Sequence, residues 1–159
     1  MLSLMLKFTL SDMKRLILLI ASLMMCAGLM AQNNRAEDIV GLYSGGIGRN
    51  AFRARIEKAS DGTFWGHVIW VAERFGKDGM RRMDVRNPDK SLRDTPIDEI
   101  VLFRGLKYNE KKQQWDGTKI YDPNRGIRAN VSIKFDGAKT LKIRGSVLGI
   151  SETEIWTKE

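Results

Sequence analysis

Hydrophobic and polar residues alternate one by one along most of the chain from Ile39 onward. In residues 127–135 five apolar side chains occupy the odd positions, and polar side chains occupy the even positions between them. Successive side chains of a β-strand point to opposite faces, so this period of two predicts a strand with one buried face. Residues 140–147 repeat the pattern after the hairpin signal Asp136-Gly137.

The same alternation, interrupted by clusters of turn residues, predicts eight strands in all. Short links join most of them, as in an antiparallel meander, and a meander of eight strands loses its exposed edges when it closes on itself. We therefore expect an all-β fold, an eight-stranded antiparallel up-and-down barrel. The expected strands span residues 39–45, 50–58, 63–72, 99–108, 114–121, 126–135, 140–147 and 152–158.

An abrupt reversal, D-P-N-R-G at residues 122–126, separates the fifth and sixth expected strands. Asp122 can accept hydrogen bonds from backbone amides ahead of it, and Pro123 fixes its own φ. Asn124 and Gly126 tolerate left-handed backbone conformations. The segment is predicted to turn the chain, and this role needs no chemistry.

One connection is much longer than the others and runs over residues 75–96. Loops beyond about 15 residues in a compact domain tend to be functional or disordered. Residues 87–89, N-P-D, start a turn, and residues 91–93 can form one helical turn. We expect this long loop to pack as a flap over one end of the barrel.

Residues 1–31 have the pattern of a secretory signal peptide, which would form an N-terminal signal helix, and residues 32–159 are expected to form a single barrel domain. Lys14-Arg15 precede an uncharged apolar run that ends near the small residue Ala31. The run is shorter than the roughly 20 residues of a membrane-spanning helix. Met13 starts the compact form M-K-R-L-I-L-L-I of such a leader and is a candidate for the true start.

Cys26 allows an alternative, because lipoprotein leaders also place a cysteine after an apolar stretch. That processing needs a small residue before the cysteine, and here Met25 precedes it, which argues against a lipid anchor. After removal of the leader the chain has no cysteine, and no membrane span is expected. We therefore expect an exported protein, periplasmic or secreted, that is stabilised by core burial rather than by disulfides.

The formal net charge of +8 falls to +6 without the leader, since 24 basic and 18 acidic residues remain. A basic chain can bind nucleic acid or another polyanion. Here the charges are scattered singly on alternating segments, and the longest basic runs are the pairs Arg81-Arg82 and Lys111-Lys112. Solvated strand faces explain this distribution, and no nucleic-acid partner is expected.

Several short motifs follow one another along the chain. They are G-H-V-I-W at 66–70, N-P-D at 87–89, L-R at 92–93, Pro96, W-D-G at 115–117, I-Y-D-P at 120–123, Gly126, R-G at 144–145 and T-E-I-W at 153–156. In this order, over residues 37 to 158, they resemble a bacterial family of small exported proteins, domain of unknown function twenty-one forty-seven. The resemblance implies a lipocalin-like or calycin-like barrel outside the cytoplasm, and it implies no established activity.

The chain departs from that family at three places. Ser151-Glu152 stand where relatives usually have glycine and arginine, Tyr43 stands where the first strand usually has tryptophan, and Ile127 stands where lysine often follows the turn. If that arginine and lysine contact a ligand in relatives, this chain binds a different one.

The chemistry-bearing residues are few. His67 is the only histidine, and without a cysteine in the mature chain it cannot build a zinc site or a Cys–His pair. No nucleophile elbow or phosphate-binding loop is present. Asp116, Asp122 and Glu154 are formal candidates for a carboxylate-based enzyme. No cofactor and no catalytic residue is expected, and an enzyme is the least favoured function.

Three aspartates in the long loop, Asp78, Asp84 and Asp89, offer oxygen ligands for calcium. Their spacing is not that of an EF-hand loop, and nearby arginines add unfavourable charge. Turn formation and local ion pairs explain these aspartates better, so calcium binding stays a weak alternative.

Aromatic residues are spread over seven of the expected strands, where they fill the barrel or line a pocket at its mouth. The alternation predicts that Val68 and Trp70 face inward and that His67 faces outward. We expect binding of a small, partly apolar molecule under the flap. The alternative is a non-catalytic module that docks onto an envelope protein, glycan or anionic surface. The candidate ligand-binding residues are Tyr43, Trp70, Trp115, Tyr121, Arg144 and Trp156.

Overall fold

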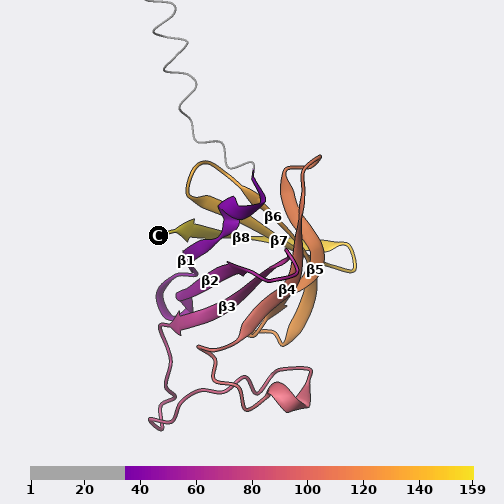
Figure 1. Cartoon of the computed structure of the whole chain (residues 1–159). Helices are drawn as coiled ribbons and strands as arrows, with labels where there is room; N and C mark the ends of the chain where they lie inside the picture. Colours follow the sequence, from indigo (N-terminus) through magenta and orange to yellow (C-terminus); the bar gives the residue numbers. More distant parts are fainter. Residues whose placement is uncertain (1–34) are drawn as a thin grey trace, which may run out of the picture. The chain divides into compact units, whose positions relative to one another are not determined.

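The computed structural model describes residues 35–159, which form a closed antiparallel barrel of eight strands (Figure 1). The strands follow one another around the barrel in sequence order, and β1 pairs with β8 to close it. The predicted fold is confirmed, and each predicted strand end lies within two residues of the observed one. The strands are β1 (Gly41–Gly45), β2 (Phe52–Lys58), β3 (Phe64–Val71), β4 (Val101–Asn109), β5 (Gln114–Asp122), β6 (Ile127–Phe135), β7 (Thr140–Val147) and β8 (Ile150–Lys158).

The predicted signal peptide, residues 1–31, lies outside the described residues. Within residues 35–159 the helical segments are three short 3₁₀ turns. They are η1 (Ala36–Ile39), η2 (Gly48–Asn50) and η3 (Lys90–Leu92). No helix in this part of the chain is long and apolar enough to cross a membrane.

One end of the barrel is closed by η1 and by the aromatic side chains beneath it. The Tyr43 hydroxyl donates a hydrogen bond to the Ile39 carbonyl at 2.8 Å, and Trp115 Nε1 donates one to the Ala36 carbonyl at 3.0 Å. Both rings are fully buried, so these bonds satisfy polar atoms that water cannot reach. Phe135 packs edge-on against Trp115 with ring centroids 5.7 Å apart. The result is a sealed, densely packed end.

A bulge in β3 reverses the alternation near the end of that strand. Ala54 of β2 pairs with Val68, whereas the preceding Arg53 pairs with Trp70, so Ile69 is an extra residue. Beyond the bulge Trp70 faces outward and is 44% exposed. The prediction that Trp70 faces the barrel interior is therefore wrong. His67, before the bulge, faces outward as predicted.

The connection from β3 to β4 contains the long loop and lies against the turn between β5 and β6. The Arg86 guanidinium donates a hydrogen bond to the Asn124 carbonyl. Gly126 has φ +68° in that turn, and a Cβ there would collide with the Arg86 carbonyl. Asn124 N–H donates to the Asp122 carboxylate at 2.9 Å, as predicted for a D-P turn. Gly126 thus allows both the reversal and the close approach of the loop.

We expect Gly66→Ala to lower the free energy of unfolding by about 1–3 kcal/mol, because it overpacks the core. A Cβ at Gly66 would lie 2.6 Å from Phe103 Cζ, and the Phe103 ring is itself buried. Gly145→Ala is the matched control, since its Cβ would lie 3.3 Å from its nearest neighbour, the Ala129 side chain. Denaturant unfolding measures both. Equal losses for the two variants would contradict this account of the packing.

Candidate functional site

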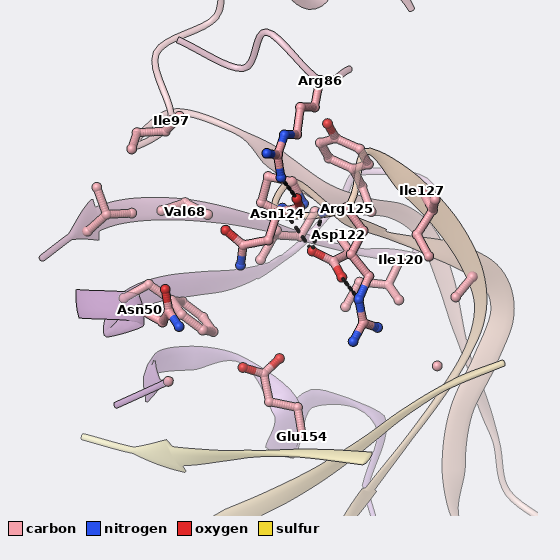
Figure 2. Close-up of a pocket in the computed structure, with 18 of the residues that line it drawn as sticks. Asn50, Val68, Arg86, Ile97, Ile120, Asp122, Asn124, Arg125, Ile127 and Glu154 are labelled. Carbon is pink, nitrogen blue, oxygen red and sulfur yellow. Dashed lines mark hydrogen bonds and ion pairs between the residues drawn. The ribbon is translucent and has the colours of Figure 1, made fainter. Parts of the chain in front are cut away.

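The other end of the barrel is open and contains a cavity of about 1270 Å³. Its walls come from the β1–β2 link, the long loop, the β5–β6 turn and the β7–β8 hairpin (Figure 2). Its apolar lining includes Phe52, Val68, Leu102, Ile120, Ile143 and Trp156. A concave, mostly apolar space with a few polar groups is the usual form of a small-molecule site.

The cavity exists because the inward side chains become smaller toward the open end. β6 and β7 pair residue by residue, and their inward pairs run Phe135 with Leu141, then Ile133 with Ile143, then Val131 with Gly145. On β6, Ala129 follows and lines the cavity. A Cβ at Gly145 would meet only Ala129 and Ile120 within 4 Å, which shows how little fills this side. The sequence therefore packs one end and leaves the other hollow.

Glu154 carries a carboxylate into this cavity from β8. It shares the inward face of the strand with Trp156, which is buried, and Figure 2 shows its side chain directed from the strand into the cavity. None of the described arginines and lysines forms an ion pair with it, because Arg125 pairs with Asp122 and Glu152 instead. Glu154 is thus an unneutralised acid on an otherwise largely apolar wall.

The surroundings of Glu154 change its ionisation. Burial raises the pKa of this carboxyl, the charge of Asp122 raises it further, and the Trp156 indole N–H opposes both. That N–H is buried and does not complete a hydrogen bond of ordinary geometry. By solvent accessibility the Glu154 side chain is exposed where the cavity opens, although protein atoms crowd it on several sides and partly desolvate it. The cavity therefore holds a carboxylate whose charged form lacks a full set of partners.

The arginines around the mouth are mostly neutralised by neighbouring acids. Arg125 Nη2 lies 3.1 Å from Glu152 Oε1. Arg49 Nε lies 3.1 Å from a Glu73 carboxylate oxygen, and Arg82 lies 3.7 Å from the other oxygen of the same group. Exposed pairs of this kind stabilise the fold little, but they reduce the positive field at the mouth.

A buried hydrogen-bond network ties the long loop to the barrel. The Tyr121 hydroxyl on β5 donates to Asp84 Oδ1 at 2.7 Å, and Asn87 Nδ2 donates to Asp84 Oδ2 at 2.7 Å. Burial and the hydrogen bond to Asp84 raise the pKa of Tyr121 well above its usual value. Since both carboxylate oxygens are engaged, the network holds this part of the wall in place rather than offering a free group.

The structure brings only two of the predicted ligand-binding residues to the cavity, Tyr121 and Trp156. Tyr43 and Trp115 belong to the packed end. Trp70 lies on the outer surface, and the exposed Arg144 donates a hydrogen bond to Ser151 Oγ at 2.8 Å.

The three aspartates weighed for calcium are each engaged separately. Asp78 accepts from Met80 N–H, Asp89 accepts from Ser91 N–H and Oγ–H, and Asp84 belongs to the Tyr121 network. Within residues 35–159 no group of three or more His, Cys, Asp or Glu side chains is placed to hold a metal ion. Of the formal catalytic acids, Asp122 and Glu154 line the cavity, while Asp116 accepts a hydrogen bond from Gln114 elsewhere on β5.

Sequence reasoning gave Glu154 only a formal catalytic role and missed its position as the free acid of the cavity. The signal was available, because Glu154 has the same parity as Trp156 on β8 and so stands in the inward row. Only Trp156 of that row is buried, so the shared parity places Glu154 in the cavity wall rather than in the packed core.

The comparisons with known proteins agree with this architecture. A family model described as an uncharacterized protein conserved in bacteria, DUF2147, matches residues 42–158. The solved structure of protein HP1028 from Helicobacter pylori, described as belonging to the lipocalin family, is similar with a TM-score of 0.61 at 20% identity. That match covers 76% of this chain and 82% of the other, and at this identity it supports the fold alone. No curated protein sequence matches the chain.

We expect Glu154→Gln to raise the free energy of unfolding of the ligand-free protein at pH 7. A carboxyl whose pKa is raised by folding stabilises the fold below its unfolded pKa of about 4.3, and that stabilisation is lost as pH rises through the folded pKa. Glutamine carries no charge, so it avoids this loss of stability at pH 7. The difference in unfolding free energy between Glu154→Gln and the wild type therefore shrinks on acidification and vanishes below about pH 4. Chemical denaturation between pH 3 and pH 8 measures it.

Glu152→Gln is the control on the same strand. Its hydrogen bond with Arg125 and the charge of that guanidinium lower the pKa of Glu152, so removing its charge gives no gain at pH 7. A loss of stability in Glu154→Gln at pH 7 would contradict the uncompensated partial desolvation of this carboxylate.

Proposed function

The chain belongs to the bacterial family DUF2147, and from this premise we propose that its barrel binds a small, partly apolar molecule in the open-end cavity. The observation that carries the proposal is the cavity itself, about 1270 Å³ in volume and lined by aliphatic and aromatic side chains. A lipocalin-like barrel that is packed solid would have no such space. Here the inward pairs of β6 and β7 shrink toward the open end and leave that space unfilled.

The energetics favour an apolar body of modest size. Removing roughly 200 Å² of apolar ligand surface from water contributes about 5 kcal/mol. Association costs several kcal/mol in lost freedom of motion, which offsets much of that gain. Because the long loop is already held by Asp84 and Arg86, little further ordering of the protein is needed on binding.

We favour binding over catalysis because the acids of the cavity are not arranged as a working pair. Asp122 accepts a hydrogen bond within its own turn and lies beside Arg125. Among the described acids that line the cavity, Glu154 is the one with neither an ion pair nor a hydrogen bond of ordinary geometry. The proposal also places the protein outside the cytoplasm, in the periplasm or the medium, on the strength of the leader-like residues 1–31.

The binding proposal is tested by filling the cavity. Ala129 faces the cavity from β6, so Ala129→Phe projects a ring into the space beside Gly145. We expect the affinity for N-phenyl-1-naphthylamine, a neutral fluorescent probe of apolar sites, to fall by about tenfold or more in this variant. Fluorescence titration measures the affinity.

Asn130→Phe supplies the matched control, because it adds the same ring at the next, outward-facing position of β6. Its affinity for the probe is expected to equal that of the wild type. Absence of probe binding to the wild type, or equal weakening in both variants, would contradict a ligand site in the cavity.

A second candidate function is docking of the open end onto a lipid surface of the cell envelope. Large aliphatic side chains stand exposed around the mouth, with Ile47 91%, Val85 68%, Leu148 99% and Ile150 74% exposed. Exposed apolar side chains gathered in one place mark interaction sites. These exposed side chains continue the apolar lining of the cavity outward. A molecule that passes from a lipid layer into the cavity would therefore contact apolar side chains along its path.

We expect the double variant Leu148→Ser and Ile150→Ser to lose co-flotation with neutral phosphatidylcholine vesicles while it keeps its affinity for the naphthylamine probe. Ile155→Ser, on the outer face of β8, removes an aliphatic side chain that is 46% exposed and lies away from the mouth, and it is expected to float as the wild type does. Wild-type protein that stays with the soluble fraction would rule out lipid docking and leave cavity binding intact.

A further inference from the structure

The cavity contains one charge that the protein itself does not balance. The arginines that line it pair with Glu73, Asp122 and Glu152, or, for Arg86, with a backbone carbonyl. Glu154 stands next to Trp156 and has no cationic neighbour in an ion pair among the described residues. Partial desolvation of an unpaired carboxylate is unfavourable, so a bound molecule that covers it and supplies the missing partner gains what the empty site lacks.

We propose that the preferred ligand is an amphiphilic amine, whose protonated nitrogen pairs with the Glu154 carboxylate and whose hydrocarbon body lies against the apolar wall. This inference rests on the proposed function, since it specifies the ligand class of the same cavity. The proposed ligand carries one cationic group and an apolar body short enough for the cavity to enclose.

The neighbourhood of Glu154 suits a cation for two reasons. Trp156 lies beside the carboxylate, and the Phe52 ring packs edge-on against it with centroids 5.3 Å apart, so aromatic faces border the position of the ammonium group. Aromatic rings attract cations electrostatically, and more strongly where water is excluded. The Trp156 N–H also holds negative charge on the carboxylate, because it favours the ionised form.

The same geometry disfavours a fatty anion. A carboxylate drawn into the cavity would approach Glu154 and would find the arginines of the mouth already paired with acids. Arg86, bonded to the Asn124 carbonyl, is the group an anion would seek instead, and it lies in the long loop at the mouth (Figure 2). A neutral alcohol would meet neither repulsion nor ion pairing. The three head groups are therefore expected to differ in affinity.

The test compares octylamine, octanol and octanoate by isothermal titration calorimetry at pH 7, because these probes share one hydrocarbon chain and differ in charge. We expect octylamine to bind about tenfold or more tightly than the other two. Glu154→Gln is expected to remove this preference by weakening octylamine while octanol is unchanged. Glu57→Gln, on the outer face of β2, removes the same charge away from the cavity and is expected to behave as the wild type.

Each outcome decides the inference. The proposed amine preference is overturned if octanoate or octanol binds as tightly as octylamine, or if Glu154→Gln keeps its affinity for octylamine. In either case the cavity remains a ligand site. Failure of all three probes to bind, together with failure of the naphthylamine probe, overturns the proposed function as well. Thermal unfolding of each variant confirms that a lost affinity is not a lost fold.

Discussion

The decrease in size of the inward side chains from one end of the barrel to the other is the constraint on which the site depends. Eight half-buried strands closed into a ring must fill or enclose whatever space their inward rows leave. At the closed end aromatic rings and η1 fill this space. The Tyr43 hydroxyl and the Trp115 N–H donate hydrogen bonds to backbone carbonyls of η1. At the open end Ala129 and Gly145 leave it empty. Dense packing and the cavity therefore lie at opposite ends of one sheet.

Glu154 is a local departure from the rules that stabilise the rest of the chain. The other described acids that line the cavity have an ion pair or a hydrogen-bond partner, as Asp84, Asp122 and Glu152 illustrate. Glu154 lines the same cavity without an ion pair among the described residues. Departures of this kind are expected where a protein binds something, because the missing partner is supplied from outside. Under the proposed amine preference, the cost of this carboxylate in the empty cavity is the counterpart of selectivity for a cationic ligand.

Much of the fold could be predicted from the sequence because its determinants are local. Alternation within a strand and turn residues between strands give the strand number, their order and nearly all their ends. The outward position of Trp70 was not predicted because the bulge depends on pairing with Arg53 and Ala54 of the neighbouring strand. Alternation along one strand does not contain that information. A pocket at the mouth was expected, but most of the residues that line it were not predicted, for a related reason. The small residues that create it come from different strands, and only the register of β6 with β7 places Val131 opposite Gly145.

The difference between the two ends is tested most directly by methyl NMR of isoleucine-labelled protein titrated with N-phenyl-1-naphthylamine. Ile120 and Ile143 line the cavity, whereas Ile56 and Ile133 are fully buried outside its lining. The account predicts chemical-shift changes that are large and saturable at Ile120 and Ile143 and small at Ile56 and Ile133. Shifts of equal size at all four methyl groups, or none at any of them, would contradict it.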